Sequence, residues 1–324
     1  KKLDLTFDMY DKKTDGILLR LNTSQLTGLE PPIQNAATVS NKGWEISAQY
    51  NEKWGDFKMN LGFNLSDVNN KILDMKGQSS GTILRQQVGS SVNSIYGFIA
   101  DGLYQNQAEI DAGPTQFGTL KPGDIRYKDI AGAFDANGNP IGDGKITDAD
   151  RAIIGSTVPR YTYGFNMGFS WRGFRLSALI QGVGKADGYL DSHYSIPAVN
   201  SSAVKPWQLD YWTPENTDAK YPRVSLTSTN NTQNSTMWMR SAAYTRLKNV
   251  QIGYELPKSF IDNTFLTSVY IYLNGQNLLT FTKFYEGYDP EINYNAGSTD
   301  GVSLGGGNYY PQVKTFSFGI DVKF

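Results

Sequence analysis

The chain has 324 residues, and its 30 basic residues balance 31 acidic ones to a formal net charge of -1, which excludes the basic field of a nucleic-acid-binding protein. Cysteine is absent and histidine occurs once, which excludes disulfide frameworks, thiol chemistry and zinc or iron sites with several Cys or His ligands. With 33 Gly, 20 Tyr, 16 Phe and 6 Trp, the composition fits a turn-rich β protein, either a water-soluble sandwich or a membrane barrel.

The N-terminus, Lys1-Lys2-Leu3-Asp4, lacks the apolar core and small-residue cleavage site of a secretory signal. We expect either that a signal was removed or that the chain starts within a longer protein. No run reaches the roughly 18 apolar residues that a membrane-spanning helix needs. Any crossing of a membrane would therefore be made by strands, whose backbone groups pair with neighbouring strands.

Alternation of apolar and polar residues predicts eight strands, most near the length of a tilted membrane-crossing strand. In the clearest, 161–171, the odd positions are Tyr, Phe, Met or Trp and the even positions are Thr, Gly, Asn or Ser. One face of the strand therefore suits lipid and the other suits water. In chain order the predicted strands are Leu3–Tyr10, Trp44–Tyr50, Phe57–Ser66, Tyr161–Trp171, Phe174–Val183, Thr245–Leu256, Val269–Thr280 and Thr315–Phe324.

The connections between these strands distinguish a membrane barrel from a soluble sheet. Short links at 51–55, 172–173 and 257–268 alternate with long segments at 11–43, 67–160, 184–241 and 281–314. A soluble antiparallel sheet also alternates along its strands but rarely carries so many long irregular loops. Short periplasmic turns and long extracellular loops are typical of outer-membrane barrels. Aromatic residues at strand ends, such as Trp44 and Trp171, suit the lipid–water boundary.

The polar face of the predicted strands indicates how wide the barrel is. An eight-stranded barrel has an interior filled by side chains, whereas this face is rich in Gly, Ser, Thr and Asn and has few large side chains. We therefore predict an all-β fold, an antiparallel transmembrane β-barrel with long extracellular loops, of which these strands form part of a wider wall.

Short motifs, each weak by itself, run along nearly the whole chain. In order they are Asn41–Glu45, Tyr96–Phe98, Asp101–Gln105, Pro122–Asp129, Asp143–Ile146 with Asp150-Arg151, Trp212–Asn216, Tyr221–Arg223, Leu247–Val250, Gly275–Leu279, Gly287–Glu291 and Tyr310–Gln312. Together, and in this order, they resemble the C-terminal region of SusC-like (RagA-like) TonB-dependent transporters.

The resemblance implies that residues 1–324 supply the last eight strands of a 22-stranded barrel with a plugged lumen. The plug, the signal peptide and the segment that contacts TonB would lie upstream of Lys1. It further implies import of a large nutrient, a glycan or a peptide, across the bacterial outer membrane, and a SusD-like surface lipoprotein over the extracellular mouth. This chain would be part of the barrel wall and vestibule, surrounded by outer-membrane lipid, with no nucleic-acid partner and no enzymatic activity.

Two other functions stay open from the sequence. The first is a standalone small outer-membrane barrel with an adhesin or structural role. The second is a secreted carbohydrate-binding β-sandwich, which would be soluble without detergent.

Segment 129–151 resembles a calcium-loop pattern of the transporter family, D-x-N-x-D-G-x-I-x-x-x-D, in which oxygen ligands at alternating positions surround a hard cation. The candidate ligands are Asp129, Asp143, Lys145, which would offer its carbonyl, and Asp150. The third position of the pattern is Ala131, and residues 133–142 interrupt the loop. The alternative is a solvated, turn-rich loop without Ca²⁺.

Aromatic residues gather in the last two long segments and suit stacking on sugars or peptides. The candidates for substrate contact are Trp207, Trp212, Tyr285, Tyr288 and Tyr309. The alternative is that these rings pack the loops on one another or contact the lipoprotein. The single histidine, His193, is expected to be a solvated loop residue rather than part of a catalytic triad, and no catalytic residue is predicted.

Overall fold

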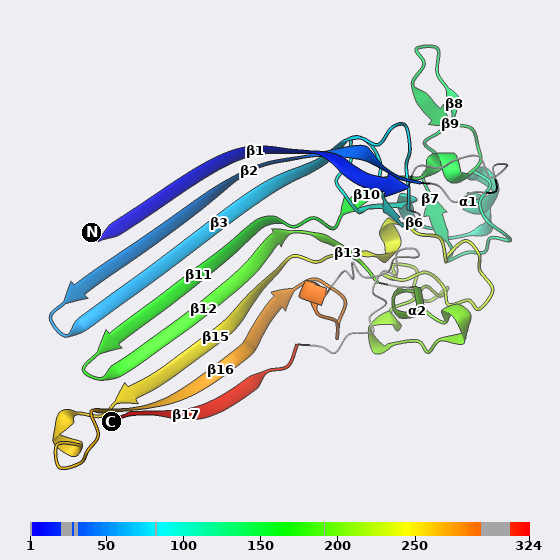
Figure 1. The fold of residues 1–324 in the computed structure, drawn as a ribbon. Coiled ribbons are helices and arrows are strands. Elements are labelled where there is room, and N and C mark those ends of the chain that lie inside the picture. Colours follow the sequence, from blue (N-terminus) through cyan, green and yellow to red (C-terminus); the bar gives the residue numbers. More distant parts are fainter. Residues whose placement is uncertain (1, 21–27, 29–31, 82, 191, 293–311) are drawn as a thin grey trace.

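The computed structural model describes residues 2–20, 28, 32–81, 83–190, 192–292 and 312–324, and its largest element is an antiparallel sheet of eight strands (Figure 1). In the order of the sheet these are β1 (Leu3–Arg20), β2 (Ile33–Trp54), β3 (Phe57–Asp74), β11 (Arg160–Trp171), β12 (Phe174–Lys185), β15 (Tyr244–Glu255), β16 (Ser268–Thr282) and β17 (Thr315–Lys323). Each predicted strand lies in one of these, overrunning it by at most one residue. The all-β, antiparallel prediction is confirmed.

Short connections lie at one end of the sheet. Arg172 and Gly173 join β11 to β12 with positive φ angles of 45° and 90°, as a two-residue hairpin needs to match the twist of its strands. Gly55, also with positive φ, begins the two-residue link between β2 and β3. Segment 256–267 joins β15 to β16 at the same end and contains a 3-10 helix at Lys258–Phe260.

The first predicted long loop, 11–43, is mostly strand, which corrects that prediction. β1 continues to Arg20 and β2 already begins at Ile33, and residues 11–14 pair in register with residues 39–42. The sequence alternation stops near Tyr10 because residues 11–14 of β1 are polar on both faces of the strand. A backbone ladder persists there without an apolar row to reveal it.

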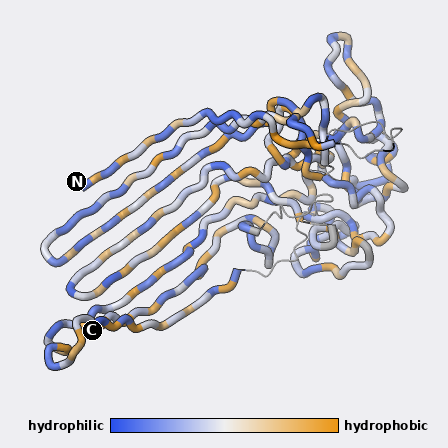
Figure 2. The backbone as a smooth tube through the Cα atoms, in the orientation of Figure 1, coloured by the Kyte–Doolittle hydropathy of each residue, from blue (hydrophilic) through white to orange (hydrophobic). Residues whose placement is uncertain are grey.

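Residues paired across the sheet form alternating apolar and polar rows, because directly opposite residues point to the same face. The apolar row is Phe63, Phe165, Ile180, Leu247 and Leu279. The neighbouring polar row is Asn64, Gly164, Gln181, Arg246 and Thr280. We call the two sides of the sheet the apolar face and the polar face, and the alternation is visible along each strand in Figure 2.

Tyrosine rings cover glycines of the neighbouring strand in the sheet. The pairs are Tyr10 over Gly43, Tyr163 over Gly182, Tyr270 over Gly253 and Tyr272 over Gly319. A Cβ atom at any of these glycines would overlap the ring. The missing side chain thus lets a large ring lie flat on the backbone and pack in the groove that a strand glycine leaves.

The long segments between the strands fold into a packed body beyond the other end of the sheet (Figure 1), instead of the irregular loops that the sequence predicts. Its core includes Phe98, Ile125, Tyr127, Tyr221 and Trp238, all at most 1% exposed. These residues come from segments far apart in the chain, so no local pattern reveals their packing. No helix among the described residues is long and apolar enough to cross a membrane.

Small elements support this loop body. They are β4 (Leu84–Arg85), β5 (Ser94–Gly97) and β10 (Ala152–Ser156) in one sheet, the pairs β6 (Ala100–Leu103) with β7 (Ile125–Tyr127), β8 (Gly132–Phe134) with β9 (Pro140–Gly142) and β13 (Asp187–Tyr189) with β14 (Met239–Ser241), and the helices α1 (Gln107–Ala112) and α2 (Ser192–Ser195).

A Gly→Ala substitution should destabilise the protein at a glycine that is covered by a tyrosine ring. Gly253→Ala places a Cβ 2.7 Å from the carbonyl oxygen of Ile271 and against the Tyr270 ring, so we expect it to lower the free energy of unfolding by about 1–3 kcal/mol. Gly168→Ala is the matched control on the same face, because its Cβ would meet only Asn60, at 3.6 Å. Urea unfolding of the protein measures both, and equal unfolding midpoints for the two variants would contradict the packing account.

Candidate functional site

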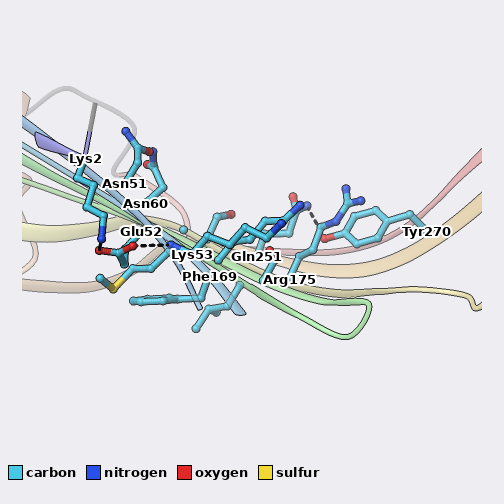
Figure 3. Close-up of a pocket in the computed structure, with 15 residues that line it drawn as sticks. Lys2, Asn51, Glu52, Lys53, Asn60, Phe169, Arg175, Gln251 and Tyr270 are labelled. Carbon is cyan, nitrogen blue, oxygen red and sulfur yellow. Dashed lines mark hydrogen bonds and ion pairs between the residues drawn. The ribbon is translucent and has the colours of Figure 1, made fainter. Parts of the chain in front are cut away.

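The polar face carries a groove of about 810 Å³ near the short turns, lined by residues of β2, β3, β11, β12, β15 and β16 (Figure 3). Lys53 lies directly opposite Lys58 across β2 and β3, an arrangement of like charges that favours an acidic neighbour. Arg175 forms an ion pair with Glu255 and lies over the ring of Tyr270, 5.1 Å from its centroid. The groove therefore suits a polar partner with carboxylate or other acceptor groups.

Neutral amides continue the groove along the polar face. Asn60 Nδ2 donates to Asn51 Oδ1 at 2.5 Å, and Gln251 Nε2 donates to the Tyr270 hydroxyl at 3.3 Å. A further hollow of about 300 Å³ has Asn166 in its lining. Amides and hydroxyls donate and accept hydrogen bonds without carrying charge, so this part of the face suits contact with water, sugars or peptide groups.

The opposite end of the polar face contains a buried charge cluster. The Arg246 guanidinium, whose side chain is 2% exposed, donates to Glu291 Oε2 at 2.6 Å and to Asp289 Oδ2 at 2.7 Å. Lys248 Nζ donates to the same Glu291 oxygen at 2.7 Å, and the Tyr244 hydroxyl donates to Glu291 Oε1 at 2.6 Å. Two cations of β15 thus meet two carboxylates of the segment that follows β16, and the cluster is neutral.

The pKa of Glu291 reflects this cluster. Burial alone would raise the pKa, but the hydrogen bonds from Lys248 and Tyr244 and the charge of Arg246 outweigh it, and the pKa lies below its usual range. Glu291 therefore stays ionised at neutral pH, as a charge-paired carboxylate should.

Two of the five aromatic candidates are buried in the loop body. Trp212 is 8% exposed, its ring packs against Gly123, and its Nε1 donates to Gln105 Oε1 at 3.1 Å. Tyr285 is 3% exposed and its hydroxyl donates to the carbonyl of Trp238. Both rings therefore pack within the loop body.

Trp207 and Tyr288 are half-buried and lie together. Their rings meet edge to face with centroids 5.9 Å apart, and Tyr194 contacts Tyr288 at 5.7 Å. Tyr194, which was not among the candidates, completes this aromatic group, and nothing local in the sequence links it to residues 13 and 94 positions away. The last candidate, Tyr309, lies outside the described residues, and His193 lies in α2.

The calcium candidates use their carboxylates to hold the loop. Asp129 accepts backbone N–H groups from Asp143 and Gly144, at 3.1 and 2.7 Å. Asp150, which is 1% exposed, accepts from Ile130, Ala131 and Thr147 at 2.8–3.0 Å. Residues 133–142, which interrupt the motif, contribute most of the β8–β9 hairpin.

These carboxylate oxygens accept N–H groups, and each oxygen has a further lone pair that a cation could use. The described residues contain no group of three or more acidic, His or Cys side chains able to hold a metal ion. Lys145 contributes its N–H to the Asp143 carboxylate, at 2.9 Å. The calcium site stays a prediction from the motif alone.

Sequence comparison finds similar proteins over nearly the whole chain. No protein-family model matches the chain. TonB-dependent receptor P3 of Formosa agariphila is 32% identical, with 100% of this chain and 32% of the relative covered. TonB-dependent receptor P26 of the same organism is 29% identical, with 97% of this chain and 32% of the relative covered. The chain thus spans about a third of the length of the curated relatives that it matches.

Solved structures share the fold. The RagAB peptide transporter matches with a TM-score of 0.77 at 23% identity, covering 100% of this chain and 34% of that chain. The RagAB peptide importer in its open-open state matches with a TM-score of 0.75 at 22% identity, covering 100% and 33%.

Asp150 gives a testable prediction about loop 129–151. In Asp150→Asn an amide NH₂ replaces one carboxylate oxygen, so either the backbone N–H of Thr147 or those of Ile130 and Ala131 lose their acceptor. An unsatisfied buried donor costs about 1–3 kcal/mol, and we expect faster hydrogen exchange at the amides on the side that loses its acceptor. Asp148→Asn makes the same change of charge at a side chain that is 87% exposed and should have little effect.

Acidification should reproduce the effect of Asp150→Asn. Burial would raise the pKa of Asp150, but the three backbone N–H donors outweigh it and leave the pKa below its usual range. The stabilisation is therefore present above the ordinary carboxyl pKa of about 4 and is lost as the pH falls through the lowered value. Equal exchange rates in the two variants across this range would contradict a structural role for Asp150.

Proposed function

We propose, from its similarity to TonB-dependent receptors over 97–100% of its length, that this chain forms part of the wall and extracellular vestibule of an outer-membrane β-barrel. The barrel imports a large nutrient, a glycan or a peptide, with energy supplied through TonB. The chain acts as a transporter segment and not as an enzyme.

The observation that carries the proposal is the in-register pair of rows across five strands. Five apolar side chains on one face and a polar row on the other, including the buried Arg246, are what a wall between lipid and a water-filled lumen requires. Phe63 and Leu279, in the apolar row, are 39% and 51% exposed. In a soluble sandwich a second sheet would cover this row.

The edges of the sheet support a barrel larger than this chain. Among the described residues β1 and β17 are the two edge strands, and β1 is 18 residues long. Unpaired backbone groups are too costly to leave in hydrocarbon, so strands from the rest of the receptor would pair with both edges. We place the chain as the last eight strands of a 22-stranded barrel, around a plug that the same receptor supplies.

The two ends of the sheet would face different compartments. The short turns would lie in the periplasm and the loop body outside the cell, because long loops of such barrels are extracellular. The loop body would then contact a SusD-like surface lipoprotein. The half-buried pair Trp207 and Tyr288 would contact the nutrient, whereas Trp212 and Tyr285 are packed too deeply to do so.

Two substitutions at adjacent residues test this proposal. In the apolar row, Phe165→Arg should cost about 2–4 kcal/mol at mid-bilayer depth and prevent assembly of the full-length receptor. Asn166→Arg puts the same side chain on the polar face, where Asn166 is exposed, and should assemble. The measurement is the folded, heat-modifiable band in isolated outer membranes, together with TonB-dependent uptake of labelled oligosaccharides and peptides by the cells.

We expect wild type and Asn166→Arg to import one of the two nutrient classes, and Phe165→Arg to import neither. Normal assembly of Phe165→Arg would contradict the membrane wall. Uptake that persists without TonB would contradict the transport mechanism while leaving the wall intact.

A further inference from the structure

The segment Lys283–Glu291, which we call the strap, follows β16 and lies on the polar face of the sheet. The register fixes this position, because Arg246 is paired with Gln181 on one side and Thr280 on the other, all in the polar row. Asp289 and Glu291 of the strap bond to the Arg246 side chain. Figure 1 shows the short helix at the end of the strap beside the end of β16.

A bulge in β15 supplies the second cation of the cluster. Relative to β12 the register shifts between Asn249, opposite Leu179, and Leu247, opposite Ile180, so Lys248 is an extra residue in β15. A bulge redirects a side chain that would otherwise follow the alternation. Lys248 consequently bonds to Glu291 in the cluster of Arg246, and the two strap carboxylates in the cluster, Asp289 and Glu291, are neutralised.

The strap has a second, apolar attachment. Phe284 and Tyr285, 8% and 3% exposed, pack in a cluster with Ala186, Leu190 and Ala242 of the loop body. Farther along the strap, Tyr288 contacts Trp207. The strap is thus fixed to the loop body by its first half and to the sheet by its last residues.

We propose that the strap is a fixed constriction at the extracellular end of the conduit, held over the polar face by the Arg246 cluster. The proposal rests on the proposed function in one respect, namely that the polar face lines the conduit. Removing one partner from a buried, neutral cluster in which every charge is paired strongly destabilises the cluster, because an uncompensated buried charge is left. The strap therefore stays in place while substrate passes, limits the size of what can reach the polar face, and positions Tyr288 beside Trp207.

The test uses the purified full-length receptor carrying Gln181→Cys in the polar row, since this chain has no cysteine of its own; any cysteine elsewhere in the receptor is replaced. Two variants release the strap from opposite sides, Arg246→Met on the sheet and Asp289→Asn with Glu291→Gln on the strap. The matched control is Arg175→Met, which also removes a cation from the polar face. Its ion pair with Glu255 is exposed, because the two side chains are 52% and 37% accessible to solvent.

Two readouts are measured: one reports release of the strap from the sheet, and the other reports whether the path to the polar face has widened. Cleavage after the exposed Glu286 by a glutamate-specific protease reports local opening of the strap. The labelling rate of the introduced thiol by a bulky maleimide relative to a small one reports the constriction. We expect both to rise roughly ten-fold or more in the two releasing variants and to stay unchanged in Arg175→Met.

Unchanged cleavage would overturn the cluster as the attachment of the strap, and faster cleavage with an unchanged labelling ratio would overturn the constriction. If Arg246→Met fails to assemble, the variant on the strap decides, because it alters no residue of the sheet. Nutrient uptake by wild-type cells is scored separately, so a receptor that imports nothing would contradict the proposed function without changing the result on the strap.

Discussion

Backbone pairing between neighbouring strands is the constraint on which the rest of this structure depends. In a bilayer every N–H and C=O group must find a partner within the protein, and the antiparallel ladder from β1 to β17 provides those partners strand by strand. Because the ladder fixes the register, it also aligns side chains into rows, and a shift of one residue would turn every apolar side chain to the polar face. The ring-covered glycines follow from the same geometry, since a ring can lie flat on a strand only where no Cβ intervenes.

The register also determines where the loop body attaches. Arg246 belongs to the polar row, and the neighbouring bulge of β15 against β12 redirects Lys248 to the same cluster. In the proposed wall a charge on the apolar face would have to be buried in lipid, whereas on the polar face it can be paired by carboxylates from a loop. The attachment of the strap is therefore a consequence of the alternation that forms the wall, and the aromatic pair Trp207 and Tyr288 is positioned through it.

The strands could be predicted from sequence because their signal is local. Eleven consecutive residues, 161–171, contain the full alternation of β11, whereas the ladder of residues 11–14 has both faces polar and was predicted as loop. The site could be predicted only in part. Motifs around Lys248 and Glu291 were recognised separately, but the bonds of Arg246 to residues 43 and 45 positions away have no local signature. The burial of Trp212 and Tyr285 likewise depends on segments distant in the chain, and the same residue types would suit substrate contact equally well.

The central claim is that the sheet separates lipid from a water-filled lumen, and site-directed spin labelling along β11 tests it most directly. Single nitroxides at positions 161–171 of the full-length receptor in bilayers would be examined for collision with oxygen, which partitions into lipid, and with a water-soluble nickel chelate. The account predicts alternation with a period of two, with oxygen collisions highest at Phe165 and Met167 and nickel collisions highest at Asn166. Equal access of the nickel chelate to both sets of positions would contradict the account.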